Sequence, residues 1–198
     1  MANVSRINGF RPLKDQFGRP YNGATTMYYV TSGNATAIGI GDLVVLEGTT
    51  DVNGVRCVKQ AAANGVCVGP VVGVKVSGGT GAPSLDAPQY VAASTGKYVY
   101  VADDPNILMV AQEDSVGAAT ALTDIGLNVN FIVAAASTTT GLSGMQVDSS
   151  TKDTTNTLPL RLVGFLQAED NTPASTNAKV IVAFNTHQYR SNTGSTGV

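Results

Sequence analysis

The chain has 198 residues, which suits one domain, or one domain with an arm, and allows a sizeable core without disulfides or metals. Twelve basic side chains stand against 14 acidic ones, and the net charge of -2 excludes a general attraction to nucleic acid or to anionic lipid. The composition is typical of strands and turns, and a charged fraction of only 13% favours a protein that holds much of its surface in contacts.

Residues 1–26 are expected to form an extended N-terminal arm. They hold four basic side chains against a single acidic one, Gly and Pro recur, and no helix or strand period is present. The apolar and aromatic side chains spaced along this segment need a surface, either a partner molecule or the chain's own domain. Four charges with interleaved aromatics are a weak signal for nucleic acid, and the rest of the chain does not support it.

Residues 27–190 are expected to form a β domain. The short apolar runs MYYV, IGIGDLVVLEG, VRCVK and VCVGPVVGVKV are separated by turn signals, of which Asn53-Gly54 is a strong one. Strands this closely spaced predict an all-β fold, namely an antiparallel β-sandwich or barrel, either jelly-roll-like or a smaller open barrel. Cys57 and Cys67 lie in apolar surroundings without a CxxC pattern, which favours reduced, packed thiols, while a pairing across a hairpin stays open.

Residues 97–115 are expected to form a β-hairpin. The apolar runs KYVYV and ILMVAQ flank Asp104-Pro105-Asn106, whose side chains suit a type I turn. Side chains alternate across a strand, so a hairpin with one solvated face would be polar at every second position, and this one is not. Both of its faces therefore need cover, one from the core and the other from a second layer, a terminus or another subunit.

The remainder of the β domain contains two further strand regions and one long loop. DIGLNVNFIVA predicts a strand, and LPLRLVGFLQ and KVIVAFN predict a final pair. Between them, residues 135–156 are rich in Ser and Thr and are expected to form a long surface loop. Residues 191–198 are expected to form a polar C-terminal tail with nothing to bury.

The chain offers little for catalysis, and we predict that it is not an enzyme and needs no cofactor. His187 is the only histidine, and it follows the last strand, where a local hydrogen bond is the simpler interpretation. Residues 141–145, GLSGM, miss the last Gly of a nucleophile elbow, so a hydrolase would require His187 beside Ser143 or an Asp. The Gly39-Ile40-Gly41 and 78–81 glycine runs lack the rest of a nucleotide-binding motif and are interpreted as turns.

Four acidic residues near the ends of the expected hairpin are candidates for a hard cation such as calcium. They are Asp103, Asp104, Glu113 and Asp114. Their spacing matches no ligand loop, so we interpret the first pair as turn residues and the second as solvated strand ends, and we predict no metal site.

Several strings of residues, in order along nearly the whole chain, resemble the structural cement or head decoration proteins of tailed bacteriophages. They are MANVSRINGFRP, YVYVADDPNILMVAQEDSVG, DIGLN, GLSGMQVDSST, LRLVGFLQAEDN and NTHQ. The resemblance implies a predominantly β protein that sits on the outer surface of the icosahedral head. It also implies binding across neighbouring major capsid proteins, as a dimer or trimer, in a way that locks the expanded shell.

We therefore expect a virion structural protein whose partners are the major capsid protein and further copies of itself. No charged-then-apolar leader and no membrane-length apolar run is present, so synthesis in a host cytoplasm and no membrane or nucleic acid partner are expected. The alternative is a surface-displayed β module that binds a glycan or receptor. The residues expected at the capsid or subunit interfaces are Phe10, Arg11, Phe17, Arg19, Tyr98, Tyr100, Ile107 and Met109.

Overall fold

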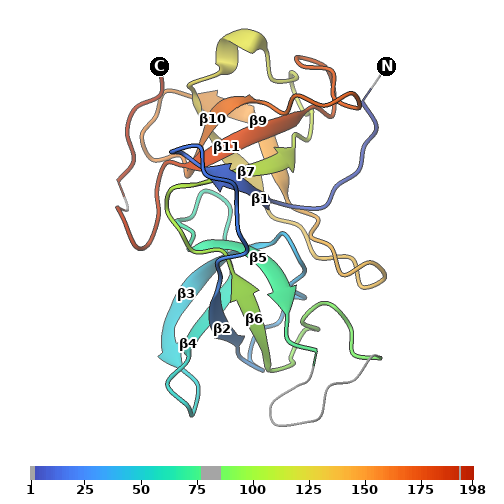
Figure 1. Cartoon of the computed structure of the whole chain (residues 1–198), viewed down its shortest axis with the longest axis vertical. Coiled ribbons are helices and arrows are strands. Elements are labelled where there is room, and N and C mark those ends of the chain that lie inside the picture. Colours follow the sequence, from blue (N-terminus) through green and yellow to red (C-terminus); the bar gives the residue numbers. More distant parts are fainter. Residues whose placement is uncertain (1–2, 77–85, 192) are drawn as a thin grey trace.

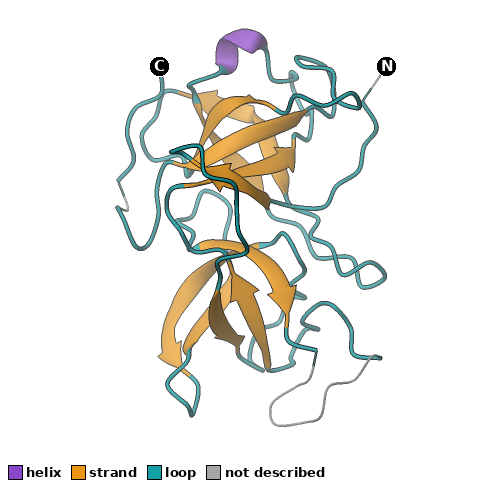
Figure 2. Ribbon diagram, viewed as in Figure 1, coloured by secondary structure: helices purple, strands orange, loops and turns teal. Residues whose placement is uncertain are grey.

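The chain is all-β, as predicted, with a closed barrel and a six-stranded sheet packed together. The structure is a computed structural model that describes residues 3–76, 86–191 and 193–198, and within them one short 3-10 helix, η1 (Leu122–Asp124), interrupts the strands (Figure 2). In chain order the strands are β1 (Arg11–Asp15), β2 (Thr26–Val30), β3 (Leu43–Thr50), β4 (Arg56–Gln60), β5 (Gly69–Val74), β6 (Lys97–Val101), β7 (Ile107–Gln112), β8 (Asn128–Ile132), β9 (Gln146–Asp153), β10 (Leu160–Phe165) and β11 (Lys179–Phe184).

Five strands form the barrel in the order β2-β4-β3-β5-β6, and the pairing of β6 with β2 closes it. β2 and β4 pair in parallel, and the other neighbours are antiparallel. Alternate side chains point inward, so Tyr28, Val99 and Val101 fill the interior. Figure 1 shows the barrel below the sheet. The glycine run at 78–81 lies outside the described residues.

The sheet has the order β1-β7-β11-β10-β8-β9, and all of its neighbours are antiparallel. Met109, Phe131 and Leu162 lie in its core, which also includes Leu43 and Cys67 at the near end of the barrel. The apolar core of the sheet therefore continues into the barrel, and the expected single β domain holds two connected cores.

The prediction of a hairpin over residues 97–115 is wrong, although the predicted turn forms. The backbone N–H of Ile107 donates to the Asp104 carbonyl (3.1 Å), and that of Asn106 donates to the Asp104 side chain (2.9 Å). The two strands that flank the turn then separate, because β6 pairs with β2 and β5 in the barrel while β7 pairs with β1 and β11 in the sheet. The segment is thus the crossover between the two sheets.

The extended arm expected over residues 1–26 is not confirmed. β1 is an edge strand of the sheet, and the preceding Phe10 is fully buried with its ring 6.2 Å from that of Phe131. Asn3 donates its side-chain amide to the carbonyl oxygens of Thr172 and Thr176, between β10 and β11. The described part of this segment, residues 3–26, is therefore laid on the chain's own domain.

The long surface loop expected over residues 135–156 contains strand β9. Met145, Val147 and Ser149 alternate inward, and Ser149 is satisfied because its N–H and hydroxyl both donate to Asp114 (3.0 and 2.8 Å). The prediction failed because a buried serine does not show an apolar period in the sequence.

The polar tail at residues 191–198 is fastened to the sheet. Arg161 donates to the carbonyl oxygens of Ser195 and Thr196 (2.8 and 2.7 Å), and the N–H of Val198 donates to the Gly126 carbonyl (3.2 Å). Hydrogen bonds to the backbone of the tail, rather than apolar burial, hold the tail on the sheet. The composition of the tail does not reveal such bonds.

Cys57 and Cys67 are free and buried, as the reduced interpretation predicts, and no hairpin disulfide forms. Burial raises the pKa of the Cys67 thiol well above its ordinary value, because the apolar surroundings disfavour a thiolate. Both cysteines are therefore small core residues.

A buried carboxylate, Asp42, joins the barrel to the segment before β9. Its oxygens accept from the Ser143 hydroxyl, from the Gly39 N–H (2.8 Å) and from the Gln60 amide (3.4 Å). Burial raises the pKa of Asp42 to about 6, although these hydrogen bonds act to lower it. The Gly39-Ile40-Gly41 segment and the segment at residues 141–145, which superficially resemble enzyme motifs, are thus packed on each other through this contact.

A buried imidazole, His187, makes a second link between the two sheets. Its Nε2 lies 2.7 Å from the Val68 carbonyl, just before β5, and its Nδ1 accepts from the N–H of Tyr189 (3.1 Å). Since Nδ1 accepts, Nε2 carries the proton and the ring is neutral. Burial lowers the pKa of His187, while the bond to Val68 acts against that effect. The local hydrogen bond expected for this residue is confirmed.

Gly9 provides a sharp test of the packing around Asp42. Its φ is +69°, and an added Cβ would lie 2.5 Å from both the Gly41 carbonyl oxygen and the Ser143 Cβ. Gly9→Ala should therefore lower the free energy of unfolding by about 3 kcal/mol, from left-handed strain together with overpacking. Gly18→Ala is the matched control, because φ is +88° there with nothing within 4 Å, and it should cost only about 1 kcal/mol. Chemical denaturation measures both, and equal losses would contradict the close packing.

Candidate interaction surface

The structure divides the expected interface residues into buried and exposed groups. Phe10, Ile107 and Met109 lie in the core of the sheet, so they cannot meet a partner, and their assignment to an interface is wrong. The physical reason is that Ile107 and Met109 lie on the face of β7 that packs on the core of the sheet, where the Phe10 ring also packs against Phe131. The residues that remain exposed or partly exposed are Arg11, Phe17, Arg19, Tyr98 and Tyr100.

Tyr98 and Tyr100 lie on the outside of the barrel. Cross-strand pairing places Tyr98 opposite Tyr29 and Tyr100 opposite Met27, so all four side chains share the outer face of β6 and β2. The rings of Tyr29 and Tyr98 are 5.0 Å apart, and the Lys75 ammonium lies 5.0 Å from the centre of the Tyr98 ring. We call Met27, Tyr29, Tyr98 and Tyr100, together with Val52, the barrel patch.

The turn between β3 and β4 extends the barrel patch. Val52 at its tip is fully exposed. Asp51 accepts a hydrogen bond from the hydroxyl of Tyr98. This bond lowers the pKa of Asp51, with smaller effects from the hydrogen bonds of Val55 and Asn53. The same bond raises the pKa of Tyr98. A groove of about 840 Å³ runs between this turn and the two tyrosine rings. The turn is therefore tied to the barrel wall and presents an apolar tip beside an aromatic groove.

A second exposed aromatic, Phe17, stands on the turn after β1. The Asp15 carboxylate accepts from the N–H groups of Phe17 and Arg19 (2.9 and 2.8 Å) and forms an ion pair with the Arg19 guanidinium. Partial burial acts to raise the pKa of Asp15, but the hydrogen bonds and charge of Arg19 outweigh it, and that pKa is lowered. Asp15 thus holds a tight turn that leaves Phe17 73% exposed.

The residues considered for hydrolysis are not brought together as a catalytic group. Ser143 donates to Asp42 in a buried contact, whereas the ring nitrogens of His187 bond to Val68 and Tyr189. Strand β8 leads into the Ser143 segment, which continues as β9 without a helix. The strand-turn-helix setting of a nucleophile elbow is therefore missing from this part of the chain.

The four acidic residues considered for calcium point to separate protein partners. Asp103 accepts from the Tyr28 hydroxyl (2.8 Å) and Asp104 from the Asn106 N–H (2.9 Å), while Glu113 accepts from the Thr120 N–H (2.7 Å) and Asp114 from Ser149. Within the described residues, no three His, Cys, Asp or Glu side chains gather as a metal site requires. Glu113 is buried rather than a solvated strand end, so that part of the interpretation is wrong.

The comparisons with known proteins identify no relative. No family model matches the chain, and neither a curated protein nor a solved structure is significantly similar to it. None of the helical segments in the described part of the chain has the length and apolar character that a membrane crossing needs.

Sequence reasoning missed Met27, Tyr29 and Val52 as members of the barrel patch. The strand pattern of Met27–Val30 predicts that Met27 and Tyr29 share one face, but only the pairing of β2 with β6 places Tyr29 beside Tyr98. A useful signal was present in the turn, where an apolar Val52 stands between Asp51 and Asn53 with no local reason to be apolar.

Proposed function

We propose that the chain is a virion structural protein that binds the outer surface of an icosahedral head and stabilises the expanded shell by bridging major capsid protein subunits. The observation that carries this proposal is the barrel patch, where a fully exposed Val52 lies beside the tilted, contacting rings of Tyr29 and Tyr98 on a chain of low charge. Aromatic and apolar side chains gathered in this way are typical of protein interfaces. The sequence resemblance to phage head decoration proteins supports the same function.

The two-part architecture also supports attachment at more than one point. The barrel patch lies on the lower unit of Figure 1, while the Phe17 turn belongs to the upper sheet. A protein that holds two neighbouring subunits at once gains effective concentration for the second contact. A stable contact of this kind buries on the order of 1,600 Å² in total. We propose synthesis in the host cytoplasm and self-association as a dimer or trimer on the shell.

Removing two rings of the barrel patch should strongly weaken attachment. We expect Tyr98→Ser with Tyr100→Ser to weaken binding to expanded heads at least about a hundredfold, because interface tyrosines carry about 2 kcal/mol or more each. Occupancy is measured by co-sedimentation with heads that lack the protein, and sedimentation velocity gives the oligomer mass.

Two control variants separate the patch from the fold. Tyr98→Phe keeps the ring but loses the hydrogen bond to Asp51, and Leu122→Ser removes an exposed apolar side chain on η1, remote from the barrel. Leu122→Ser should bind heads as the wild type does, and Tyr98→Phe, which keeps the ring but unties the turn from the barrel, should bind much more tightly than the double serine variant. If the double serine variant also binds normally, the barrel patch is not the attachment surface.

The role of the N-terminal segment is best tested by a point variant. Deleting residues 1–24 would remove β1 and the buried Phe10, so lost binding would report only misfolding. Phe17→Ser leaves the Asp15 hydrogen bonds in place, because they come from backbone N–H groups and Arg19. Undiminished head occupancy of this variant would remove the Phe17 turn from the interface.

The second candidate function is a surface-displayed β module that binds a glycan or receptor. The groove of the barrel patch favours it, because two tyrosine rings lie beside the polar side chains of Asp51 and Asn53. Aromatic faces and amide or carboxylate groups suit the apolar and hydroxyl-bearing sides of a sugar. Glycan binding by the isolated protein that Tyr29→Ala abolishes would establish this function in place of the first.

A further inference from the structure

The outer face of the six-stranded sheet has an apolar centre that the core does not use. Register places Val110 of β7 between Arg11 and Ile181, and it places Leu108 between Lys14 and Ala183. These side chains point away from the core of the sheet, because their neighbours along β7, Ile107, Met109 and Ala111, point into it. Surrounding side chains leave Leu108 and Val110 only 6% and 7% exposed, so the two residues form the floors of hollows rather than an open surface. Val163 of β10 is 42% exposed on the same face. We call this surface the sheet face.

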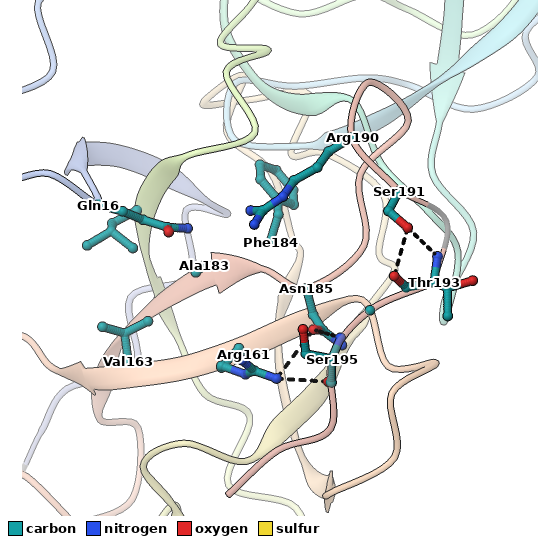
Figure 3. A pocket seen from close by; sticks show the side chains of 12 residues that line it. Gln16, Arg161, Val163, Ala183, Phe184, Asn185, Arg190, Ser191, Thr193 and Ser195 are labelled. Atoms are coloured by element: carbon teal, nitrogen blue, oxygen red, sulfur yellow. Dashed lines mark hydrogen bonds between the residues drawn. The ribbon is translucent and has the colours of Figure 1, made fainter.

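Two hollows lie on the sheet face. The larger, of about 520 Å³, is lined by Leu108, Val163 and Ala183, with Arg161 and Arg190 at its sides. Figure 3 shows these two arginines on opposite sides of the strand that carries Ala183. The smaller hollow, of about 240 Å³, is lined by Val110 with Arg6, Arg11, Lys179 and Asp170, among others.

The sheet face carries positive charge that the chain does not neutralise. The linings of the two hollows hold five cations and one carboxylate, on a chain whose net charge is -2. That carboxylate, Asp170, already forms an ion pair with Lys179. Within the described residues, Arg6, Arg11 and Arg190 have no carboxylate at ion-pair distance. Arg161 donates to the C-terminal tail and to Asn128, which holds its charge in place at the side of the larger hollow.

We propose that the sheet face is a second docking surface, which binds an acidic, extended segment of the shell protein that presents carboxylates and apolar side chains on the same side. This inference deepens the proposed function and rests on it for the identity of the partner. Successive side chains of an extended segment point to opposite sides, so the two kinds must recur on one side, where apolar side chains enter the hollows and carboxylates reach the arginines at their sides. Together with the barrel patch, the sheet face would let one molecule hold two neighbouring subunits.

Two other occupants fit the sheet face less well. Nucleic acid is disfavoured because none of the described residues that line the two hollows is an exposed aromatic on which a base could stack. The apolar floors would also offer no partner to the phosphates. A second copy that paired the same faces would bring unpaired arginines against arginines. Both alternatives are outcomes of the experiments below.

The first experiment uses peptides, so it does not depend on heads. The probe is Ac-EEVVEEVV-NH2, in which each side of the extended chain carries both Glu and Val, and Ac-EVEVEVEV-NH2 is the control with equal charge whose Glu and Val lie on opposite sides. Amide chemical shifts of the full chain should change at Val110 and Ile181 with the first peptide only. Arg11→Glu with Arg190→Glu should weaken this binding at least about tenfold at about 0.05 M salt, with a smaller difference at about 0.5 M.

Lys59→Glu, an exposed charge reversal on barrel strand β4, is the matched control and should bind the peptide as the wild type does. Shifts that map elsewhere, or equal effects of Lys59→Glu and the double reversal, would overturn the inference. So would tighter binding of a single-stranded oligonucleotide at the same residues. A protein mass that doubles in the wild type and falls to the monomer with the double reversal would assign the sheet face to a second copy instead.

The second experiment separates the inference from the proposed function. Expanded heads are titrated with the wild type, the barrel-patch serine variant and the Arg11→Glu, Arg190→Glu variant. If only the barrel-patch variant loses occupancy, the capsid function stands and the sheet-face inference fails. If the double reversal also loses at least about tenfold in affinity in a salt-dependent way, the inference is supported. If the wild type does not bind heads, the proposed function fails, and the peptide experiment alone decides the chemistry of the sheet face.

Discussion

Asp42→Ala should lower the free energy of unfolding by about 3 to 4 kcal/mol, one of the largest effects of a single substitution in this chain. The carboxylate is fully buried, and its loss leaves the Gly39 N–H and the Ser143 hydroxyl without their acceptor. The contact joins the start of β3 to the segment before β9, so both the barrel and the sheet should loosen there. Urea denaturation followed by circular dichroism measures the change.

Asp42→Asn and Ser143→Ala are the matched controls for that prediction. The asparagine keeps an acceptor oxygen in the same place, and the alanine removes only one donor, so each should cost about 1 to 2 kcal/mol. A loss for Asp42→Ala no larger than that for Ser143→Ala would show that the carboxylate does not organise this contact.

The pH dependence of Asp42 has a defined sign. Its pKa is raised to about 6 in the folded chain, so between about 3.8 and 6 the folded state binds more protons than the unfolded state. Asp42 therefore makes the free energy of unfolding fall as pH rises through this window, by about 3 kcal/mol in all. Asp42→Asn should remove that contribution, which is read as the difference between the two pH profiles.

His187→Ala should cost about 3 kcal/mol, the second large effect. The substitution removes the donor to the Val68 carbonyl and leaves a cavity beside the Phe184 ring, whose centre lies 4.9 Å from that of the imidazole. His187→Phe fills the volume without the hydrogen bonds, so its smaller loss separates packing from hydrogen bonding. Thermal and urea unfolding measure both variants, and an unchanged His187→Ala protein would contradict the link between β11 and the barrel.

The pH dependence of His187 runs in the opposite direction to that of Asp42. Its folded pKa lies below 6.5, so the unfolded state binds more protons just below that pH. Stability from the neutral imidazole is complete above about 6.5 and is lost as pH falls toward the folded pKa. His187→Phe should lack this slope. Because the two groups oppose each other at acidic pH, the profile of the wild type alone does not reveal either one.

The interaction surfaces show how far local sequence patterns reach. Alternation within KYVYV placed Tyr98 and Tyr100 on one face, and the structure confirms that Val99 and Val101 lie on the other. The same reasoning assigned Met109 to an interface, and the structure buries it. The difference is that both faces of ILMVAQ are apolar, so alternation alone could not tell which face meets the core, and packing against segments distant in sequence places Met109 there.

The candidate surfaces gained members that local patterns could not supply. Tyr29 joins the barrel patch through pairing with β6, and Arg190 joins the sheet face because the chain returns beside β10 and β11 after His187. Neither contact has a local signature, because each depends on residues far apart in the chain.

The sequence by itself determined that this chain is all-β, that a turn forms at Asp104–Asn106, and that Cys57 and Cys67 are packed thiols. These are local properties, since strand propensity, turn chemistry and apolar surroundings act over a few residues. Only the tertiary structure decided that β6 and β7 separate after that turn, one into the barrel and the other into the sheet. A turn sets the direction of the chain, whereas the partner of each strand is chosen by the apolar faces that it can bury against distant segments.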